Sequence, residues 1–189
     1  MVKKTICFLA YAEYYNDARI KSYVNALIED DYTVDLFCLY DSHSNTSNVK
    51  GLSIYFLGKK YQGNNRVLYL FNYLIFLIKS FLYISVYFAR KNYAVFHIHN
   101  QPDLLVFSTI VPKILGRKII LDLHDIMMAG VVSKFNDSKN SFLYKLTKLQ
   151  TKISAAFSDI LICADHSQKE FLIENGITHR NLFVFLKDH

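Results

Sequence analysis

Short apolar runs alternate with longer stretches of helical period along the chain. The short runs are rich in β-branched and aromatic residues, which is typical of buried β-strands. Strands that alternate with helices predict a mostly parallel sheet flanked by helices on both faces. The expected fold class is therefore α/β, a single Rossmann-like, doubly wound domain. The predicted strands are Thr5–Ala10, Thr33–Leu39, Leu52–Leu57, Val95–His99, Lys118–Leu123, Ile160–Cys163 and Leu182–Leu186.

Four stretches between the strands show the helical period and carry recognisable end signals. Asp17 is a natural N-cap for the first helix, because its short side chain can accept hydrogen bonds from free backbone N–H groups. Pro102 suits the first turn of the second helix, and Gly116 suits its C-terminal cap. The third helix covers about Phe142 to Phe157, and the fourth opens with a capping box at Ser167–Glu170 and ends at Gly176.

The stretch 67–89 is long enough to span a bilayer and carries one charge, Lys79. On a helical wheel at about 100° per residue, its tyrosines and other polar side chains share one stripe with the flanking Arg66 and Arg90. Phe76 intrudes into this stripe, and Ile84 lies at its edge. This segregation predicts an amphipathic helix that packs its apolar side on the sheet. A transmembrane span and a helix that also touches a membrane surface stay open as alternatives. The apolar side consists of Leu70, Leu74, Leu77, Ile78, Phe81 and Phe88.

Composition narrows the class of protein and of partner. With 189 residues, 52% of them hydrophobic and 20% charged, the chain resembles one folded domain and not a disordered segment. The net charge of +6 indicates an anionic neighbour, such as nucleic acid, an anionic lipid surface or a phosphorylated small molecule. Because the basic residues are scattered, we expect no nucleic-acid partner.

Three separated cysteines, Cys7, Cys38 and Cys163, each lie within an apolar run. Their spacing favours core side chains in a reducing cytosol over disulfides or a metal site. The opening MVKKTICFLAYA has the outline of a short signal peptide. A first core strand is favoured instead, because the following helix needs that strand to form a β-α unit.

Two predicted strands turn polar where they end. AVFHIHN closes with His99 and Asn100, and KIILDLHD closes with His124 and Asp125. The carboxyl ends of parallel strands meet at one edge of the sheet, where helix N-termini also point and where ligands bind. The sequence therefore predicts a binding crevice at this edge.

The loop before the first helix reaches the same edge and adds Asp17 and Arg19. Backbone N–H groups at a helix start, together with a guanidinium group, can dock an anionic ligand. We therefore expect Asp17, Arg19, His99 and Asn100 to be substrate-binding residues.

His124 is the strongest catalytic candidate. Its imidazole could donate a hydrogen bond to a sugar hydroxyl or exchange a proton near neutral pH, although a structural histidine fits the pattern equally well. Asp125 could orient a hydroxyl nucleophile or cap the next segment. The sequence lacks G-x-G-x-x-G, G-x-x-x-x-G-K-[ST] and G-x-S-x-G, so NAD binding, P-loop chemistry and a hydrolase triad lose their usual support.

A metal site is the less favoured interpretation of the histidines. His97 and His99 share one face of a strand, and Asp122 with His124 has the same spacing. Zinc needs three or four converging ligands, and no cysteine lies nearby in the sequence. We therefore expect no metal, a buried His97 hydrogen-bonded within the sheet, and a buried Asp122 that accepts from a backbone or side-chain donor.

Three stretches resemble the N-terminal, acceptor-side domain of GT-B-fold glycosyltransferases of family 4, and together they cover nearly the whole chain. H-x-H-N-x-P-D followed by L-D-L-H-D is the most specific part, and the D-A-R helix start is less so. The stretches are FLAYAEYYNDARIKSYVNALIEDDYTVDLFCL, YAVFHIHNQPDLLVFSTIVPKILGRKIILDLHD and FSDILICADHSQKEFLIENGITHRNLFVF.

The resemblance implies that residues 1–189 form the first half of a GT-B fold. Enzymes of this kind transfer a sugar from a nucleotide-sugar donor with retention, mostly in bacterial surface polysaccharide biosynthesis. The histidine matching His124 would reach the transferred sugar, and the arginine matching Arg19 would lie beside the cleft. The implied partners are a nucleotide-sugar, a glycan or lipid-linked acceptor and a donor-binding domain or subunit, with no cofactor. The implied location is the cytoplasm, with peripheral contact at the inner membrane face left open.

Two departures from that pattern limit what the resemblance implies. The 189 residues do not include the second Rossmann domain, which grips the nucleotide, so we expect the isolated chain to transfer sugar slowly or not at all. Many relatives carry Pro-Glu after the His-Asp pair, where this chain has Met127–Gly130, which argues against a carboxylate role in that loop. The alternatives are a non-catalytic subunit that docks on a donor-binding partner or a membrane, and a Rossmann enzyme with a nucleotide cofactor.

Overall fold

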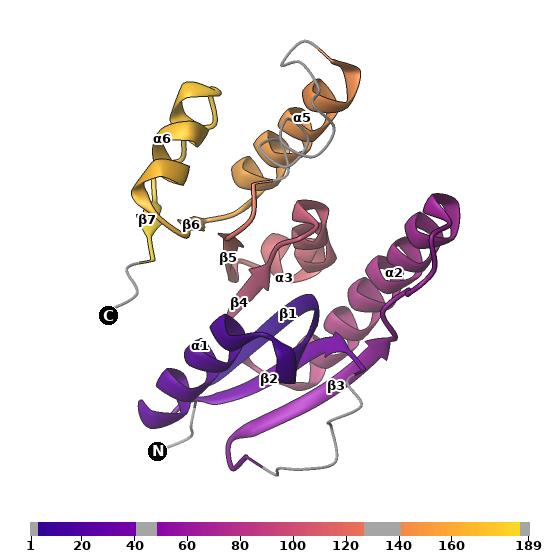
Figure 1. Ribbon diagram of the computed structural model, residues 1–189. Helices are drawn as coiled ribbons and strands as arrows, with labels where there is room; N and C mark the ends of the chain where they lie inside the picture. Colours follow the sequence, from indigo (N-terminus) through magenta and orange to yellow (C-terminus); the bar gives the residue numbers. More distant parts are fainter. Residues whose placement is uncertain (1–3, 41–48, 127–140, 186–189) are drawn as a thin grey trace.

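The computed structural model describes residues 4–40, 49–126 and 141–185, and within them the strands form one parallel sheet (Figure 1). The strand order is β3-β2-β1-β4-β5-β6-β7, which reverses direction between β1 and β4 as in a doubly wound fold. The predicted α/β class is therefore confirmed. The strands are β1 (Thr5–Glu13), β2 (Thr33–Leu39), β3 (Leu52–Gly58), β4 (Tyr93–His99), β5 (Lys118–Leu123), β6 (Ile160–Cys163) and β7 (Leu182–Val184).

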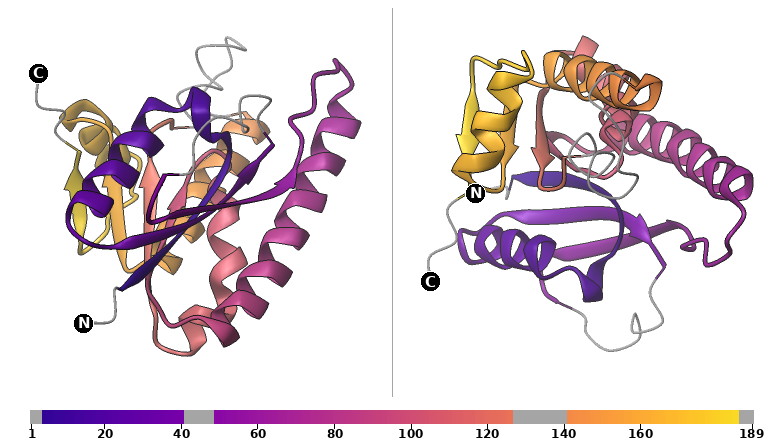
Figure 2. Two further views of the ribbon diagram at one scale, coloured as in Figure 1. Left: turned by 90° about the horizontal axis from the view of Figure 1, so that it is seen from below. Right: turned by 45° about the horizontal axis from the view of Figure 1, so that its top comes forward.

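Helices cover both faces of the sheet, but unevenly (Figure 2). One face carries α1 (Ala18–Glu29), which a short 3₁₀ helix, η1 (Tyr14–Asn16), precedes. The opposite face carries α2 (Arg66–Arg90), the 3₁₀ helix η2 (Asp103–Thr109) with α3 (Ile110–Ile114), α5 (Phe142–Phe157) and α6 (His166–Glu174).

Two predicted helices have the expected ends. The side chain of Asp17 caps α1 by accepting from the backbone N–H groups of Arg19 and Ile20, each at 3.0 Å. The bounds of α5, Phe142–Phe157, agree with the prediction. The start of α1 and both ends of α5 could therefore be predicted from the sequence.

Two helix starts differ from the prediction. The second helix begins as 3₁₀ and not as α, and the Pro102 carbonyl accepts the Leu105 N–H at 3.1 Å in a three-residue turn. The predicted capping box of α6 lies two residues too late. Asp165 is the N-cap, and its carboxylate accepts the Gln168 N–H at 2.7 Å. Asp-x-x-Gln and Ser-x-x-Glu overlap in this segment, and the earlier pair forms the cap.

The core divides into two clusters, one on each face of the sheet. Phe8, Ile20 and Leu36 pack under α1, whereas Phe37 and Ile98 belong to the larger cluster on the other face. The three cysteines are buried thiols and not disulfides, as the apolar runs around them predicted.

The long helix α2 is present as predicted, but it buries the other side. Phe76, Ser80 and Ile84 are at most 1% exposed and face the core. The apolar side that we expected to pack on the sheet is largely in solvent, and Leu70 is 62% and Ile78 51% exposed. The wheel correctly separated a polar and an apolar side of α2, but the prediction that the apolar side packs on the sheet is wrong.

The polar stretches Asp41–Lys50 and Lys134–Asn140 are typical of surface loops, and all of the second and residues 41–48 of the first lie outside the described residues. So do the Met127–Gly130 stretch and the last residue of the predicted seventh strand, Leu186.

Candidate functional site

The predicted site residues gather where β1, β4 and β5 end, beside the reversal of strand order. Arg19 follows β1, His99 and Asn100 end β4, and His124 and Asp125 follow β5. This is the edge at which open parallel sheets bind ligands.

Asp122 connects these elements, which the sequence did not indicate. Its Oδ1 accepts a hydrogen bond from Arg19 Nη2 at 2.7 Å. Its Oδ2 lies 3.5 Å from His99 Nδ1 and 3.7 Å from His97 Nε2. Asp122 is fully buried, and burial by itself raises the pKa of its carboxyl group. The imidazoles of His97 and His99 and the Arg19 guanidinium outweigh this effect and lower the pKa to about 2. Asp122 is therefore an ionised, buried anchor, and the prediction of a buried acceptor is confirmed.

Arg19 is held in place by this pair and by aromatic rings. Its guanidinium carbon lies 5.0 Å from the Phe185 ring centroid and 6.0 Å from that of Tyr23. Its side chain is 18% exposed. Only a small part of the Arg19 side chain is therefore exposed at this edge of the sheet, and its positive charge is paired with Asp122.

His97 and His99 are buried, at 5% and 1% exposure, and their rings stack with centroids 4.5 Å apart. Burial, followed by the neighbouring His97, lowers the pKa of His99 well below its usual value. His97 Nε2 and both ring nitrogens of His99 have no hydrogen-bond partner within residues 4–40, 49–126 and 141–185. The predicted burial of His97 is confirmed, and its Nε2 lies 3.7 Å from the Asp122 carboxylate; its hydrogen bond within the sheet stays a prediction.

His97, His99 and Asp122 place one donor atom each within 4.8 Å of one another. Two imidazoles and a carboxylate are ligands that zinc accepts. The Arg19 guanidinium already bonds the same carboxylate at 2.7 Å, so a metal ion would share its ligand with a fixed cation. The expectation of a site without a metal stays a prediction.

The side chain of Asn100 forms hydrogen bonds to the loops that follow β4 and β5. Its side-chain N–H groups donate to the Asp125 carbonyl at 2.7 Å and to Asp103 Oδ1 at 3.0 Å, and its oxygen accepts the His124 N–H at 3.1 Å. Asn100 is 3% exposed and His99 is 1% exposed. The expectation that these two side chains contact substrate is therefore wrong for this conformation, because the burial that positions the loop also removes them from solvent.

Asp17 also has a structural duty. Its carboxylate accepts two backbone N–H groups as the cap of α1, which occupies the groups that were expected to bind an anion. The same bonds position Arg19, the second residue of that helix, and the expectation that Asp17 contacts substrate stays a prediction.

His124 and Asp125 lie nearest to solvent. His124 is half-buried, Asp125 is exposed, and the His124 ring centroid is 6.4 Å from that of His99. The His124 carbonyl accepts from Gln168 Nε2 at 2.9 Å. Gln168 was missed because the SQKE motif was interpreted only as a helix start, whereas its side chain fixes the strand end that carries His124.

A hollow of about 340 Å³ lies farther along the same edge, beyond β2 and β3. Its lining includes Lys59, Lys60, Tyr40 and the carboxylate of Glu13, with Lys59 Nζ 5.2 Å from the Tyr40 ring centroid. The two lysines outnumber this carboxylate, and together with the aromatic ring they suit an anionic group attached to a sugar or a lipid. This hollow could not be predicted from the sequence, because its residues come from the ends of three separate strands.

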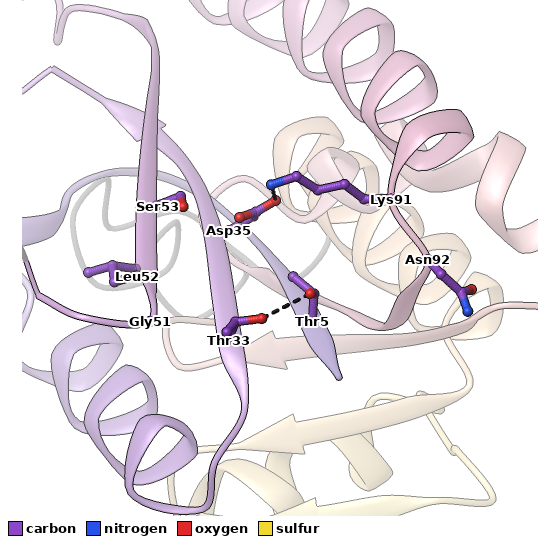
Figure 3. A pocket seen from close by; sticks show the side chains of 8 residues that line it. All are labelled: Thr5, Thr33, Asp35, Gly51, Leu52, Ser53, Lys91 and Asn92. Atoms are coloured by element: carbon purple, nitrogen blue, oxygen red, sulfur yellow. Dashed lines mark hydrogen bonds and ion pairs between the residues drawn. The ribbon is translucent and has the colours of Figure 1, made fainter. Parts of the chain in front are cut away.

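A second hollow, of about 430 Å³, lies at the opposite edge, where the strands begin (Figure 3). Its charged groups are paired: Asp35 accepts from Lys91 Nζ at 2.5 Å and from the Tyr93 hydroxyl at 2.6 Å. These bonds fasten the end of α2 to the sheet. We therefore interpret this hollow as structural.

The sequence matches no protein-family model and no curated protein. Among solved structures, it is similar to sucrose-phosphate synthase from Thermosynechococcus elongatus, with 13% identity and a TM-score of 0.69, over 96% of this chain and 47% of that one. Phytolacca americana UGT2, complexed with UDP-2-fluoro-glucose and pterostilbene, gives 9% identity and a TM-score of 0.66, over 96% and 53%. A Listeria monocytogenes protein described as a UDP-N-acetylglucosamine 2-epimerase is similar as well, with 12% identity and a TM-score of 0.61. The match covers 96% of this chain and 45% of that one.

This chain thus spans about half the length of the structures that it matches. At such identities the likeness shows the fold: a Rossmann-like domain that corresponds to one half of GT-B structures.

Proposed function

We propose that this domain is the acceptor-side half of a glycosyltransferase that uses a nucleotide-sugar donor. The supporting observation is the cluster at the β4 and β5 ends, where His124 is held by Asn100 and Gln168 beside the Arg19–Asp122 pair. Similar folds in a sucrose-phosphate synthase and in UGT2 with a bound sugar-nucleotide analogue are compatible with this proposal. Retention at the sugar, a role in bacterial surface polysaccharide biosynthesis and a cytoplasmic location belong to the same proposal.

In this proposal, each residue has a separate role. His124 donates a hydrogen bond to a hydroxyl of the transferred sugar, and Asp125 orients the attacking hydroxyl group. Arg19 and Asp122 keep the strand ends together, because their ion pair joins the start of α1 to β5. Lys59 and Lys60 hold an anionic group of the acceptor. A second domain closes over the site and binds the nucleotide, because one domain cannot enclose both substrates or exclude water.

The experiment follows transfer of a radiolabelled sugar to membrane acceptors in extracts of cells that overproduce the chain. The extract, unlike the isolated chain, can supply a donor-binding domain or subunit, so we expect more transfer than in control extracts, and we expect His124→Ala to remove the increase. His166→Ala is the matched control, because His166 is an exposed histidine on α6 outside the site. Equal transfer with wild type and His124→Ala would reject the catalytic role and favour a non-catalytic subunit that docks on a donor-binding partner.

A sugar-nucleotide epimerase is the second candidate, since the Listeria protein shares the fold. The two activities differ in their need for an acceptor. Conversion of a UDP-sugar to its epimer without any acceptor, followed by NMR, would favour the epimerase and count against the transferase.

A further inference from the structure

Helix α2 exposes an apolar face that no other element within residues 4–40, 49–126 and 141–185 covers. The side toward the core buries Phe76, Ser80 and Ile84, and the Ser80 hydroxyl donates to the Phe76 carbonyl at 2.8 Å. The outer side is almost entirely hydrocarbon. Its exposed members, between 36% and 72% exposed, are Val67, Leu68, Leu70, Phe71, Leu74, Ile75, Ile78, Phe81, Leu82 and Val86.

Helix α5 has the same arrangement. It buries Tyr144, Thr147, Thr151, Ser154 and Ala155 and directs leucines and an isoleucine outward. The end of α3 adds two more exposed side chains, Ile114 at 78% and Leu115 at 61%. The exposed apolar members of α5 are Phe142, Leu143, Leu146, Leu149 and Ile153.

These helices lie on one face of the molecule, opposite α1, and η2 contacts both α2 and α5 (Figure 2). We call the outward residues of α2, α3 and α5 the outer helical face. An apolar surface of this extent exceeds the scattered exposed side chains of ordinary soluble domains and indicates a surface that binds something.

The charge of the outer helical face has one sign. The chain has 16 acidic residues, yet none lies in 66–90, 110–118 or 141–157. The exposed basic residues within these segments include Lys79, Arg90, Lys145 and Lys152. Hydrocarbon bordered by positive charge complements an anionic lipid surface, whose acyl region accepts the hydrocarbon and whose headgroups attract the lysines.

By length and composition, α2 is the one helix within the described residues that could cross a membrane. Its packing favours a helix that lies on the membrane instead. Phe76 and Ile84 are part of the main core cluster, and Lys91, just past the helix, pairs with the buried Asp35 at 2.5 Å. A spanning α2 would have to withdraw these groups from the sheet and leave a hole in the core.

We propose that the outer helical face docks on an anionic lipid bilayer, with α2 parallel to the surface. The apolar side chains enter the boundary of the acyl region, and Tyr69 and Tyr83, each almost half exposed, lie at headgroup level. Because α2 begins shortly after Lys59 and Lys60, the docked membrane lies beside the hollow that those lysines line. The docking does not depend on the proposed sugar transfer.

The test is flotation of the purified chain with vesicles, which needs no substrate. We expect binding to phosphatidylcholine vesicles that contain about 30% phosphatidylglycerol, several-fold weaker binding to pure phosphatidylcholine, and weakening by about 0.5 M salt. Ile78→Glu should reduce binding at least tenfold. Ile173→Glu, which changes an isoleucine of similar exposure on α6, should leave binding unchanged, and circular dichroism checks that both variants fold.

A second pair of variants tests the charge. Lys145→Gln with Lys152→Gln should weaken binding to anionic vesicles by about 30-fold, from roughly 1 kcal/mol for each lysine near the surface. Lys4→Gln with Lys50→Gln, two exposed lysines elsewhere, should leave it within about twofold.

Three results would overturn the proposal. The first is absence of binding to both kinds of vesicle. The second is binding that resists alkaline carbonate and yields only to detergent, which would indicate a span. The third is a stable dimer in solution that Ile78→Glu dissociates while vesicles bind nothing, which would assign the outer helical face to a second copy of the chain.

Discussion

The carboxylate of Asp122 lies among three basic side chains, and its removal should be costly. Asp122→Asn leaves the mostly buried Arg19 guanidinium without its ionic partner, so we expect the free energy of unfolding to fall by about 3 kcal/mol. The measurement is urea denaturation at neutral pH. Asp159→Asn is the control: its 2.7 Å pair with Lys113 is partly exposed, and we expect a loss of about 1 kcal/mol or less. Similar losses in both variants would contradict the buried-anchor assignment.

His99 should make stability depend on pH below neutrality. Its pKa is lowered in the folded protein, so below the unfolded value of about 6.5 the unfolded chain binds more protons. The free energy of unfolding should therefore fall as pH falls, by up to about 1.4 kcal/mol per pH unit. Asp122, whose pKa is lowered to about 2, contributes stability above the unfolded value of about 3.9 and loses it only as pH falls toward 2.

Urea denaturation at pH 7, 6 and 5 checks this for wild type and for His99→Asn. The variant should lose most of the slope, whereas His166→Gln should keep it. Asp103 titrates in the opposite sense, because burial raises its pKa and protonation then favours the folded state. The difference between wild type and variant isolates His99, and an unchanged slope in His99→Asn would reject the assignment.

At the residue scale, the sequence indicated where the site lies better than what each side chain does. The polar strand ends located Arg19, His124 and Asp125 at one edge. The sequence could not show that the Asn100 side chain bonds Asp103, His124 and Asp125, because such partners depend on the tertiary structure. Gln168 was missed for the same reason.

At the scale of elements, two overlapping capping boxes, one beginning at Asp165 and one at Ser167, compete for the start of α6. Asp165→Ala should lower the free energy of unfolding by about 1 kcal/mol, because the N-cap carboxylate accepts the Gln168 N–H. Ser167→Ala should change it by less than about 0.5 kcal/mol. Chemical denaturation of both variants decides between the two capping boxes. A larger loss for Ser167→Ala would restore the original prediction.

The existence and bounds of most elements could be predicted because their hydrophobic periods are strong. The orientation of α2 could not. A wheel separates two sides of a helix, but the side that packs depends on what the neighbouring elements present. Here Ser80 approaches the core closely because its hydroxyl is satisfied within its own helix, so burying it leaves no unpaired polar group.

At the scale of the whole molecule, the strand order follows from connection rules: α1 returns the chain in one direction from β1, and α2 carries it across to β4. That reversal creates the edge at which Arg19 meets Asp122. The uneven covering of the faces was not predictable, because every helix in the sequence carries enough apolar residues to cover either side of a sheet.

Nucleotide-sugar binding tests the acceptor-side assignment at this scale. The sequence has no glycine-rich phosphate loop, and the Arg19 charge is committed to Asp122. We expect titration of the isolated chain with UDP-glucose, followed by NMR or calorimetry, to give a dissociation constant of about 1 mM or weaker. A short anionic ligand, inorganic pyrophosphate, should instead perturb signals near Lys59 and Lys60, and Lys59→Gln with Lys60→Gln should remove that response. Micromolar binding of UDP-glucose would mean that this domain binds the donor. The acceptor would then have to be assigned to the other half of the GT-B fold.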